Sequence, residues 1–419
     1  MKKLRMFSVL TSLILVCAIA LNLNGCTLQA QAKDLMKGIS PNSVNSLDSL
    51  DRYNSAVTDF AVRLFRASAE DGKNVLLSPL SVLCALAMTA NGAENETLEE
   101  MEAVLGMSKD ELNLYVYSYM NSLPDSNEYK LSLANSIWFT EDERFTVSRE
   151  FLQANADYYG ADIYKAPFND KTCREINKWV KHKTDSMIPE IIDEIPTDAV
   201  MYLVNALAFE AQWRKVYEKE QVRDGEFTKE DGTKQTAEFM YCTEGTYLED
   251  EKASGFVKYY KGGKYAFVAM LPDEGVSVSE YVASLDGEKL RAMLSDPGYT
   301  TVSTALPKFE TEYSVEMNDV LKGMGMPTAF VSDETDFTAL GTSARGNIYI
   351  NRVLHRTYIS VGEKGTKAGA ATAVEMADEA GMETLEPKEI YLDRPFVYML
   401  IDTENNIPFF IGTMTDIES

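Results

Sequence analysis

The sequence contains few of the residues from which catalytic and metal sites are usually built. Its 419 residues include only two histidines, His182 and His355, and three cysteines remain after the N-terminal segment, Cys84, Cys173 and Cys242. Three widely spaced cysteines predict buried free thiols rather than a disulfide framework or a metal site. Strings of the types GxSxG, HExxH, CxxC and GxxxxGK[ST] do not occur. These shortages disfavour an enzyme, and they predict a protein with no catalytic residue, no metal and no cofactor.

Basic residues are also scarce. The chain has 40 Lys and Arg against 65 Asp and Glu, which gives a net charge of -25 and a pI near 4.6. Nucleic acid is therefore an unsuitable partner, because its binding requires a basic surface that displaces counterions. With 45% hydrophobic and 25% charged residues, the composition is that of a folded chain that is long enough for one large core.

Only one long apolar run occurs, SVLTSLILVCAIAL, and it lies in the first 26 residues between the positive start MKKLR and the exit LNLNGC. This pattern predicts a targeting signal that is removed from the mature chain. LNGC resembles the lipobox of bacterial lipoproteins, which implies acylation of Cys26 and anchoring to a membrane surface. The alternative is plain secretion with cleavage nearby. Both alternatives predict an extracellular protein.

The remaining chain divides into a tether and one domain. Residues 27–50 are polar and rich in Ser and Asn, which predicts a flexible tether between residues 1–26 and a domain over 51–419. Apolar spacing predicts helices over 52–68 and 79–90, and the pair Ser78-Pro79 is typical of a helix start. Further helical patterns are ETLEEMEAVLG, KDELNLYVYSYMNSL, SREFLQANADYYG and CREINKWVKHKTDSMI.

Strand patterns dominate after residue 190. After that point they include AVMYLVNALAFEAQW, TAEFMY, GFVKYYKGGKYAFVAMLP and TVSTALPKFETEYSV. One strand pattern, YKLSLANSIWFT, lies earlier in the chain. Helices in the first part and strands in the second predict an α+β domain with large antiparallel or mixed sheets.

The segment EKGTKAGAATAVEMA, residues 363–377, consists mostly of small side chains. Its alanines, glutamates and methionine permit an exposed helix. Over residues 366–377 a period of two permits a strand instead, with one apolar or hydroxylated face and one face that holds both charges of this stretch, Lys367 and Glu375. The first face would carry Thr366, Ala368, Ala370, Thr372, Val374 and Met376.

Five separated segments resemble the serpin family, in the family's order. EKGTKAGAATA resembles the hinge, NVLLSPLSVLCALAM the shutter helix, VNALAFEAQW the strand that ends at the breach tryptophan, LPKFETEYSVEMNDVLKGMGMPTAF the LPKF block, and RPFVYMLIDTENNIPFFIGTM the C-terminal strands. The resemblance implies the serpin fold, a single large domain with about eight to nine helices and further β-sheets. Its five-stranded central sheet would accept a reactive-centre loop, at about 363–390, as an extra strand.

The resemblance implies a function that needs no catalytic residue in this chain. A target protease would cut the loop, form an acyl-enzyme and be trapped when the hinge enters the central sheet. The implied partners are serine proteases, elastase-like or glutamate-specific, with cysteine proteases as a further class, and the protein would be a monomer before it reacts. The alternative is a non-inhibitory serpin that acts as an extracellular binding protein. A third and more distant hypothesis is an unrelated hydrolase or a solute-binding lipoprotein.

The family pattern carries over to particular residues. The implied hinge is Glu363, Gly365, Thr366, Ala368, Gly369, Ala370, Ala371 and Thr372. The implied shutter is Ser78, Ser81, Asn205 and His355, and the implied breach residue is Trp213. The implied reactive bond joins Glu379 to Ala380, with Met376, Gly381 and Met382 as alternatives.

Overall fold

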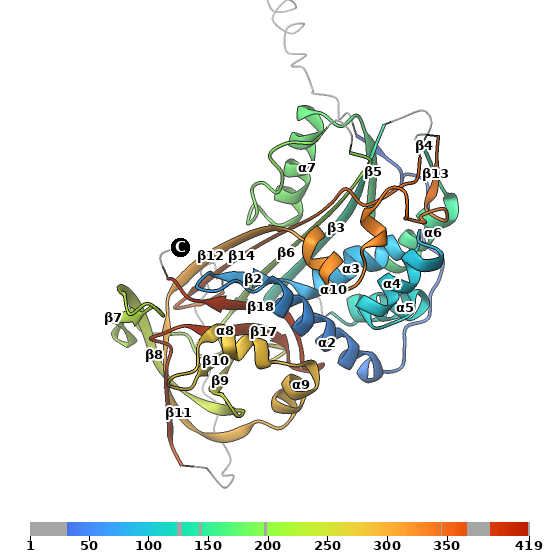
Figure 1. Ribbon diagram of the computed structural model, residues 1–419. Helices are drawn as coiled ribbons and strands as arrows, with labels where there is room; N and C mark the ends of the chain where they lie inside the picture. Colours follow the sequence, from blue (N-terminus) through green and yellow to red (C-terminus); the bar gives the residue numbers. More distant parts are fainter. Residues whose placement is uncertain are drawn as a thin grey trace, which may run out of the picture.

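Two β-sheets form the centre of the fold (Figure 1). The computed structural model describes residues 32–123, 128–141, 145–196, 199–344, 346–366 and 386–417. The main hydrophobic core lies where the two sheets meet, as shown by Phe209 of the first sheet, whose ring centroid lies 5.1 Å from that of Phe409 in the second. The α+β fold class predicted from the sequence is confirmed.

The first sheet has seven strands. In spatial order they are β1 (Lys33–Asp34), β5 (Asp162–Ala166), β3 (Tyr129–Thr140), β6 (Met201–Gln212), β15 (Gly365–Thr366), β14 (Arg352–Gly362) and β12 (Phe309–Glu316). Two of these, β1 and β15, have only two residues each. The other five form the predicted five-stranded central sheet, and the pattern YKLSLANSIWFT coincides with β3.

The second sheet has nine strands. Eight follow the order β16 (Lys388–Tyr391), β11 (Gly298–Pro307), β8 (Lys234–Glu249), β9 (Ala253–Tyr259), β10 (Tyr265–Pro272), β17 (Phe396–Asp402), β18 (Ile407–Met414) and β2 (Val75–Leu77), while β7 (Val222–Thr228) pairs with β8. A small third sheet pairs β4 (Phe145–Val147) with β13 (Gly341–Ser343). Since β16 begins at Lys388, the predicted loop over 363–390 ends in a strand of this sheet.

The described residues include nine α-helices, most of them in the first half of the chain. They are α2 (Asp51–Ser68), α3 (Pro79–Ala90), α4 (Asn95–Leu105), α5 (Lys109–Ser122), α6 (Arg149–Tyr159), α7 (Asp170–Lys183), α8 (Val278–Ser284), α9 (Gly287–Ser295) and α10 (Asn318–Met324), with 3-10 turns η1 (Lys219–Gln221) and η2 (Thr328–Phe330). Every residue of α3 is buried, and the Ser78 side chain caps it by accepting a hydrogen bond from the Ser81 amide.

The seven-stranded sheet is covered on both faces. α3 contacts β3 and β6 on the face toward the main core. On the other face α7 and the segment that follows it form a second core, in which Ile176, Val180 and Ile188 lie with Tyr202 and Leu354 of the sheet. Figure 1 shows α7 apart from the group of α2 to α6, on the opposite side of this sheet.

Residues 32–50 differ from the predicted flexible tether. β1 pairs with β5, the Leu35 amide donates to Ile163 O at 2.9 Å, and the Asn42 amide donates to the Asp157 carboxylate at 2.7 Å. Leu35, Met36 and Ile39 pack against the main core. These few apolar residues have no periodic spacing, so the polar composition concealed a segment that lies along the domain. Within the described ranges, no helix combines the length and apolar character needed to cross a membrane.

Candidate functional site

The seven-stranded sheet is open at one end, between β6 and β14. These strands pair in parallel from Tyr202 and Arg352 to Leu207 and Thr357. Further along, β15 lies between them and pairs antiparallel with both. The start of the predicted hinge therefore already occupies the position of an additional strand.

Gly365 and Thr366 fit this position because of their size. Gly365 has φ +150, and a Cβ atom there would lie 2.0 Å from Ala211 O on β6, so a larger residue cannot approach the strand so closely. The Thr366 side chain is 1% exposed, and its hydroxyl hydrogen-bonds to the Tyr260 hydroxyl. Burial raises the pKa of Tyr260 well above its usual range, so this phenol stays neutral.

The turn before β15 is fixed by Trp213. The indole stacks on Tyr260 with centroids 4.4 Å apart, its Nε1 donates to Gly362 O at 2.8 Å, and its backbone amide donates to Lys364 O at 2.9 Å. Trp213 is 1% exposed. The tryptophan predicted to lie at the breach thus lies where β15 enters the sheet.

Glu363 is held at the same turn. Its Oε1 lies 2.9 Å from Lys308 Nζ, and Lys308 also contacts Glu238 at 2.8 Å. The hydrogen bond from Lys308 lowers the pKa of the Glu363 carboxyl. The Tyr217 amide donates to Glu363 O at 3.0 Å, so both the side chain and the backbone of Glu363 are bound.

A buried ion pair supports the turn from below. Lys258, 1% exposed, lies 2.7 Å from Glu244 Oε1, and its ammonium is 4.3 Å from the Tyr217 ring centroid and 5.4 Å from that of Trp213. Neither this ion pair nor Tyr260 was predicted from the sequence. The motif KYYKGGKY holds three lysines and three tyrosines, and only the strand register decides which of them point inward.

The four predicted shutter residues come together beneath the closed part of the sheet. The Ser78 amide donates to His355 Nε2 at 3.0 Å, and Asn205 Oδ1 lies 2.5 Å from His355 Nδ1. Ser81 Oγ donates to the same Asn205 oxygen at 3.2 Å. All four are at most 1% exposed. Since Nε2 accepts a hydrogen bond, the proton is on Nδ1, and the imidazole is neutral.

Burial lowers the pKa of His355 to about 3. An imidazolium would also present an N–H to the Ser78 N–H, which leaves two donors facing each other. Two amide atoms nearby, Asn205 Nδ2 and Asn135 Oδ1, have no hydrogen-bond partner within the described residues, although they belong to directly opposed positions of β6 and β3. This polar cluster is therefore incompletely paired.

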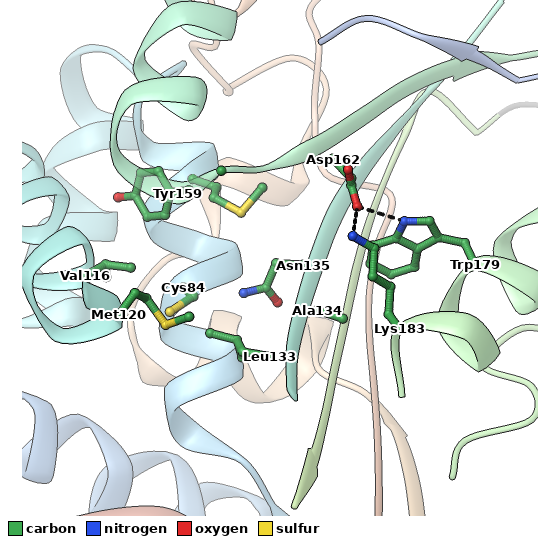
Figure 2. Close-up of a pocket in the computed structure, with 12 residues that line it drawn as sticks. Cys84, Val116, Met120, Leu133, Ala134, Asn135, Tyr159, Asp162, Trp179 and Lys183 are labelled. Atoms are coloured by element: carbon green, nitrogen blue, oxygen red, sulfur yellow. Dashed lines mark hydrogen bonds and ion pairs between the residues drawn. The ribbon is translucent and has the colours of Figure 1, made fainter. Parts of the chain in front are cut away.

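A small cavity of about 60 Å³ adjoins this cluster (Figure 2). Cys84, Met120 and Asn135 line it on the α3 side of β3, and Asp162 accepts a hydrogen bond from Trp179 Nε1 at 3.0 Å on the other side. The volume admits water-sized molecules and is far below that of a typical substrate pocket. Burial raises the pKa of the Cys84 thiol to about 12, so it does not act as a nucleophile at neutral pH.

Several predicted residues lie outside the described ranges. They are Cys26 of the lipobox, Ala368, Gly369, Ala370, Ala371 and Thr372 of the hinge, and Met376, Glu379, Ala380, Gly381 and Met382 around the reactive bond. The structure brings the described remainder together in two groups, one around Trp213 and Glu363 at β15 and one around His355.

Comparisons with known proteins agree with this geometry. The family model "Serpin (serine protease inhibitor)" matches residues 55–417. An uncharacterized serpin-like protein of Thermococcus kodakarensis is 30% identical over 86% of this chain and 84% of its own length, and the leukocyte elastase inhibitor of Homo sapiens is 29% identical over 87% and 99%. Among solved structures, the thermophilic serpin tengpin in its native state gives a TM-score of 0.87 at 47% identity, over 92% of this chain and 100% of tengpin. The latent state of tengpin gives a TM-score of 0.78 at 46% identity, over 90% of this chain and 100% of tengpin. With a family model over most of its length and a sheet that is open beside a predicted hinge, the chain belongs to the serpin family.

Proposed function

We propose that this protein is an extracellular serine-protease inhibitor that acts as a suicide substrate. Serpins are typically protease inhibitors, although some members are not. The observation that carries the proposal is the position of β15, whose two residues lie between β6 and β14 beyond the last pair that joins these two strands directly. Such a sheet can accept more of the same strand.

The registers of β15 support this proposal. Because its pairing is antiparallel on both sides, each later loop residue would stand opposite an earlier residue of β6 and of β14. Thr372 follows Thr366 by six positions, and it would stand opposite Asn205 and His355, six positions before Ala211 and Val361. Asn205 and His355 are now paired with each other, so the entering strand would separate them.

This separation would give the incompletely paired polar cluster around Asn205 and His355 a physical role. Among the residues that the structure describes, Asn205 Nδ2 has no hydrogen-bond partner, and the hydroxyl of Thr372 would enter beside it on the same face. An unpaired buried polar atom costs about 1–3 kcal/mol. Insertion would relieve part of that cost while it adds main-chain hydrogen bonds along two strands, so the closed sheet would be the less stable state.

Small side chains are needed along the path. Ala368 would stand opposite Phe209 and Ile359, whose side chains already fill the core. Overpacking such a site costs about 1–3 kcal/mol. The run of alanines and threonines therefore suits entry into a packed sheet, and a non-inhibitory serpin has no need of it.

The chemistry belongs to the protease. Its serine Oγ attacks the carbonyl carbon of the reactive bond, the peptide C–N bond breaks, and the leaving amine takes up a proton as the acyl-enzyme ester forms. The freed loop then enters between β6 and β14 and carries the bound protease with it. Trapping results because this movement deforms the protease before water can hydrolyse the ester. Glu379-Ala380 is the proposed bond, and a lipid on Cys26 would hold the inhibitor at the cell surface.

The test mixes the purified protein with glutamate-specific and elastase-like serine proteases. A band at the summed mass of both proteins on a denaturing gel would support covalent trapping, and the mass of the released C-terminal peptide would identify the bond. Thr366→Arg is the matched variant, because a guanidinium at this buried position would block entry while leaving the bond available. Cleavage of the wild type without any such band, and without a rise in its thermal stability, would contradict the proposal and favour a binding protein.

A further inference from the structure

α7 carries an exposed basic face on a protein that is acidic as a whole. Its 14 residues include five Lys and Arg and two acidic residues, whereas the whole chain has a net charge of -25. Arg174, Lys178 and Lys181 are exposed, and their spacings of four and three place them on one side of the helix. We call these three residues the basic face. Positive charge gathered in this way indicates an anionic partner.

The basic face points away from the domain. On the other side of α7, Ile176 lies in the second core. The Asn177 side chain holds the segment that follows α7 by donating to Ile192 O at 2.8 Å, and Glu175 accepts a hydrogen bond from the Ala32 amide at 2.8 Å. Because an α-helix has about 3.6 residues per turn, the basic face lies between the sides of Asn177 and Glu175, where it is directed to solvent.

The charges of the basic face are available to a partner. Among the residues that the structure describes, none of the three forms an ion pair with a carboxylate. Neighbouring lysines differ, since Lys183 lies 2.5 Å from Asp162 and Lys130 pairs with Asp185. An anionic partner that contacts the basic face therefore does not have to break an existing ion pair.

The N-terminal segment brings the proposed lipid to the same helix. Ala32, the first described residue, is hydrogen-bonded to Glu175 of α7, and β1 follows directly. Cys26 precedes Ala32 by six positions, and an extended chain of that length reaches about 20 Å. With its 14 residues α7 is itself about 21 Å long. A lipid on Cys26 would thus enter a membrane within about one helix length of the basic face.

The loop enters the sheet far from this anchor. β1 pairs with β5, which lies beside the part of β3 that is opposite residues 201–204 of β6. β15 pairs with Ala211 and Gln212, at the other end of β6. At about 3.3 Å per residue, the nine positions from Tyr202 to Ala211 span about 30 Å. A membrane at α7 would therefore leave the entry point of the loop accessible to a protease.

We propose that the basic face docks on the anionic lipid headgroups of the membrane that holds Cys26, and that this contact fixes the orientation of the domain. The inference rests on the proposed lipid anchor. A lipid alone holds one end of the chain and leaves the domain free to rotate. Each Lys or Arg near an anionic bilayer contributes about fivefold to binding. The acidic remainder of the surface is repelled, so the basic face is the one that approaches the bilayer.

The test attaches the mature chain to vesicles through an N-terminal oligohistidine sequence and a nickel-chelating lipid, which supply an anchor whether or not Cys26 carries a lipid. Phosphatidylcholine vesicles with and without about one third phosphatidylglycerol are compared, and the acetylation of each lysine is followed by peptide mass spectrometry. Lys178 and Lys181 should react about fivefold more slowly on the anionic vesicles, and high salt should abolish the difference.

Controls come from the opposite part of the molecule. Lys234 of β8 and Lys289 of α9 are exposed and lie far from α7 in Figure 1, so they should react equally on both kinds of vesicle. Arg174→Gln should reduce the protection of Lys178 and Lys181 by about twofold to fivefold, because it removes one charge of the basic face. Arg223→Gln, which removes an exposed arginine of β7, should leave that protection unchanged.

Equal acetylation rates of Lys178 and Lys181 on both kinds of vesicle would overturn the inference. Protection by a soluble anionic polysaccharide that anionic vesicles do not reproduce would also overturn it, since the basic face would then belong to a polymer. The proposals on which the inference stands are tested separately. The mass of the N-terminal peptide from cells shows whether Cys26 carries a lipid, and the denaturing gel shows whether a protease is trapped. Neither result changes the vesicle comparison, so the failures can be told apart.

Discussion

Gly365→Ala should exclude the start of the hinge from the sheet. The added Cβ would lie 2.0 Å from Ala211 O and 2.8 Å from Gln212 Cα. Both atoms belong to the β6 backbone, so no side-chain rotation can relieve the contact. β15 would have to withdraw from between β6 and β14.

The cost of this withdrawal follows from the contacts that are lost. They are the hydrogen bond between Thr366 and Tyr260 and the two backbone bonds from the Trp213 and Tyr217 amides to residues 364 and 363. At about 1 kcal/mol for each hydrogen bond, the free energy of unfolding should fall by about 2–4 kcal/mol. For a domain of this size that corresponds to a thermal midpoint lower by about 3–5 °C.

Calorimetry of intact and protease-cleaved protein measures this effect. The cleaved variant should gain less thermal stability than the cleaved wild type, and more inhibitor should be consumed per protease trapped. Gly362→Ala is the matched control, because it lies in the same turn and its added Cβ meets no atom within 4 Å. A Gly365→Ala protein that melts within about 1 °C of the wild type and traps protease equally well would refute the reasoning.

Three further predictions concern other parts of the site. Burial holds the pKa of His355 at about 3, below its unfolded value of about 6.5, so the unfolded chain binds the extra proton between these values. Stability should therefore fall as the pH drops below about 6.5, by up to about 1.4 kcal/mol per pH unit, and His355→Gln should remove this slope in urea titrations across that range. Lys258→Met leaves the buried Glu244 carboxylate without its cation and should lower the free energy of unfolding, measured by urea titration, by about 3–5 kcal/mol. Adding Glu244→Gln should restore part of this loss. Glu363→Lys places a second cation beside Lys308 and should lower the free energy of unfolding by about 1 kcal/mol or less. The thermal midpoint should fall accordingly, and the difference from the wild type should shrink in high salt.

Local patterns in the sequence predicted the elements well. The helix start at Ser78-Pro79 is confirmed because a cap and a proline act within one turn, and no distant contact decides the outcome. Residues 32–50 show the opposite case. Their docking depends on partners such as Asp157 and Ile163, which lie more than 100 positions further along the chain and which no local pattern can identify.

The candidate site could be predicted only through the family resemblance. Ser78 and His355 are separated by 277 positions, and neither residue has a neighbourhood that predicts the other. The buried pair Lys258 and Glu244 had no signal, because a lysine on a strand is usually solvated. Its burial follows from the packing of β9 and β8 beneath Trp213, which depends on the assembled sheets.

The pairing of β2 with β18 determines when this molecule can finish folding. β2 is among the first strands of the chain and β18 is the last, and Leu77 is the register partner of Ile411. α3, with the serines that contact Asn205 and His355, begins directly after β2. A chain still emerging from the ribosome therefore lacks the strand against which β2 must pair, and contacts of such long sequence separation form slowly. Until then β2 and β17 have unpaired edges that favour association with other chains. Nonsense mutations close to the C-terminus should consequently yield aggregated protein rather than folded protein of lower stability.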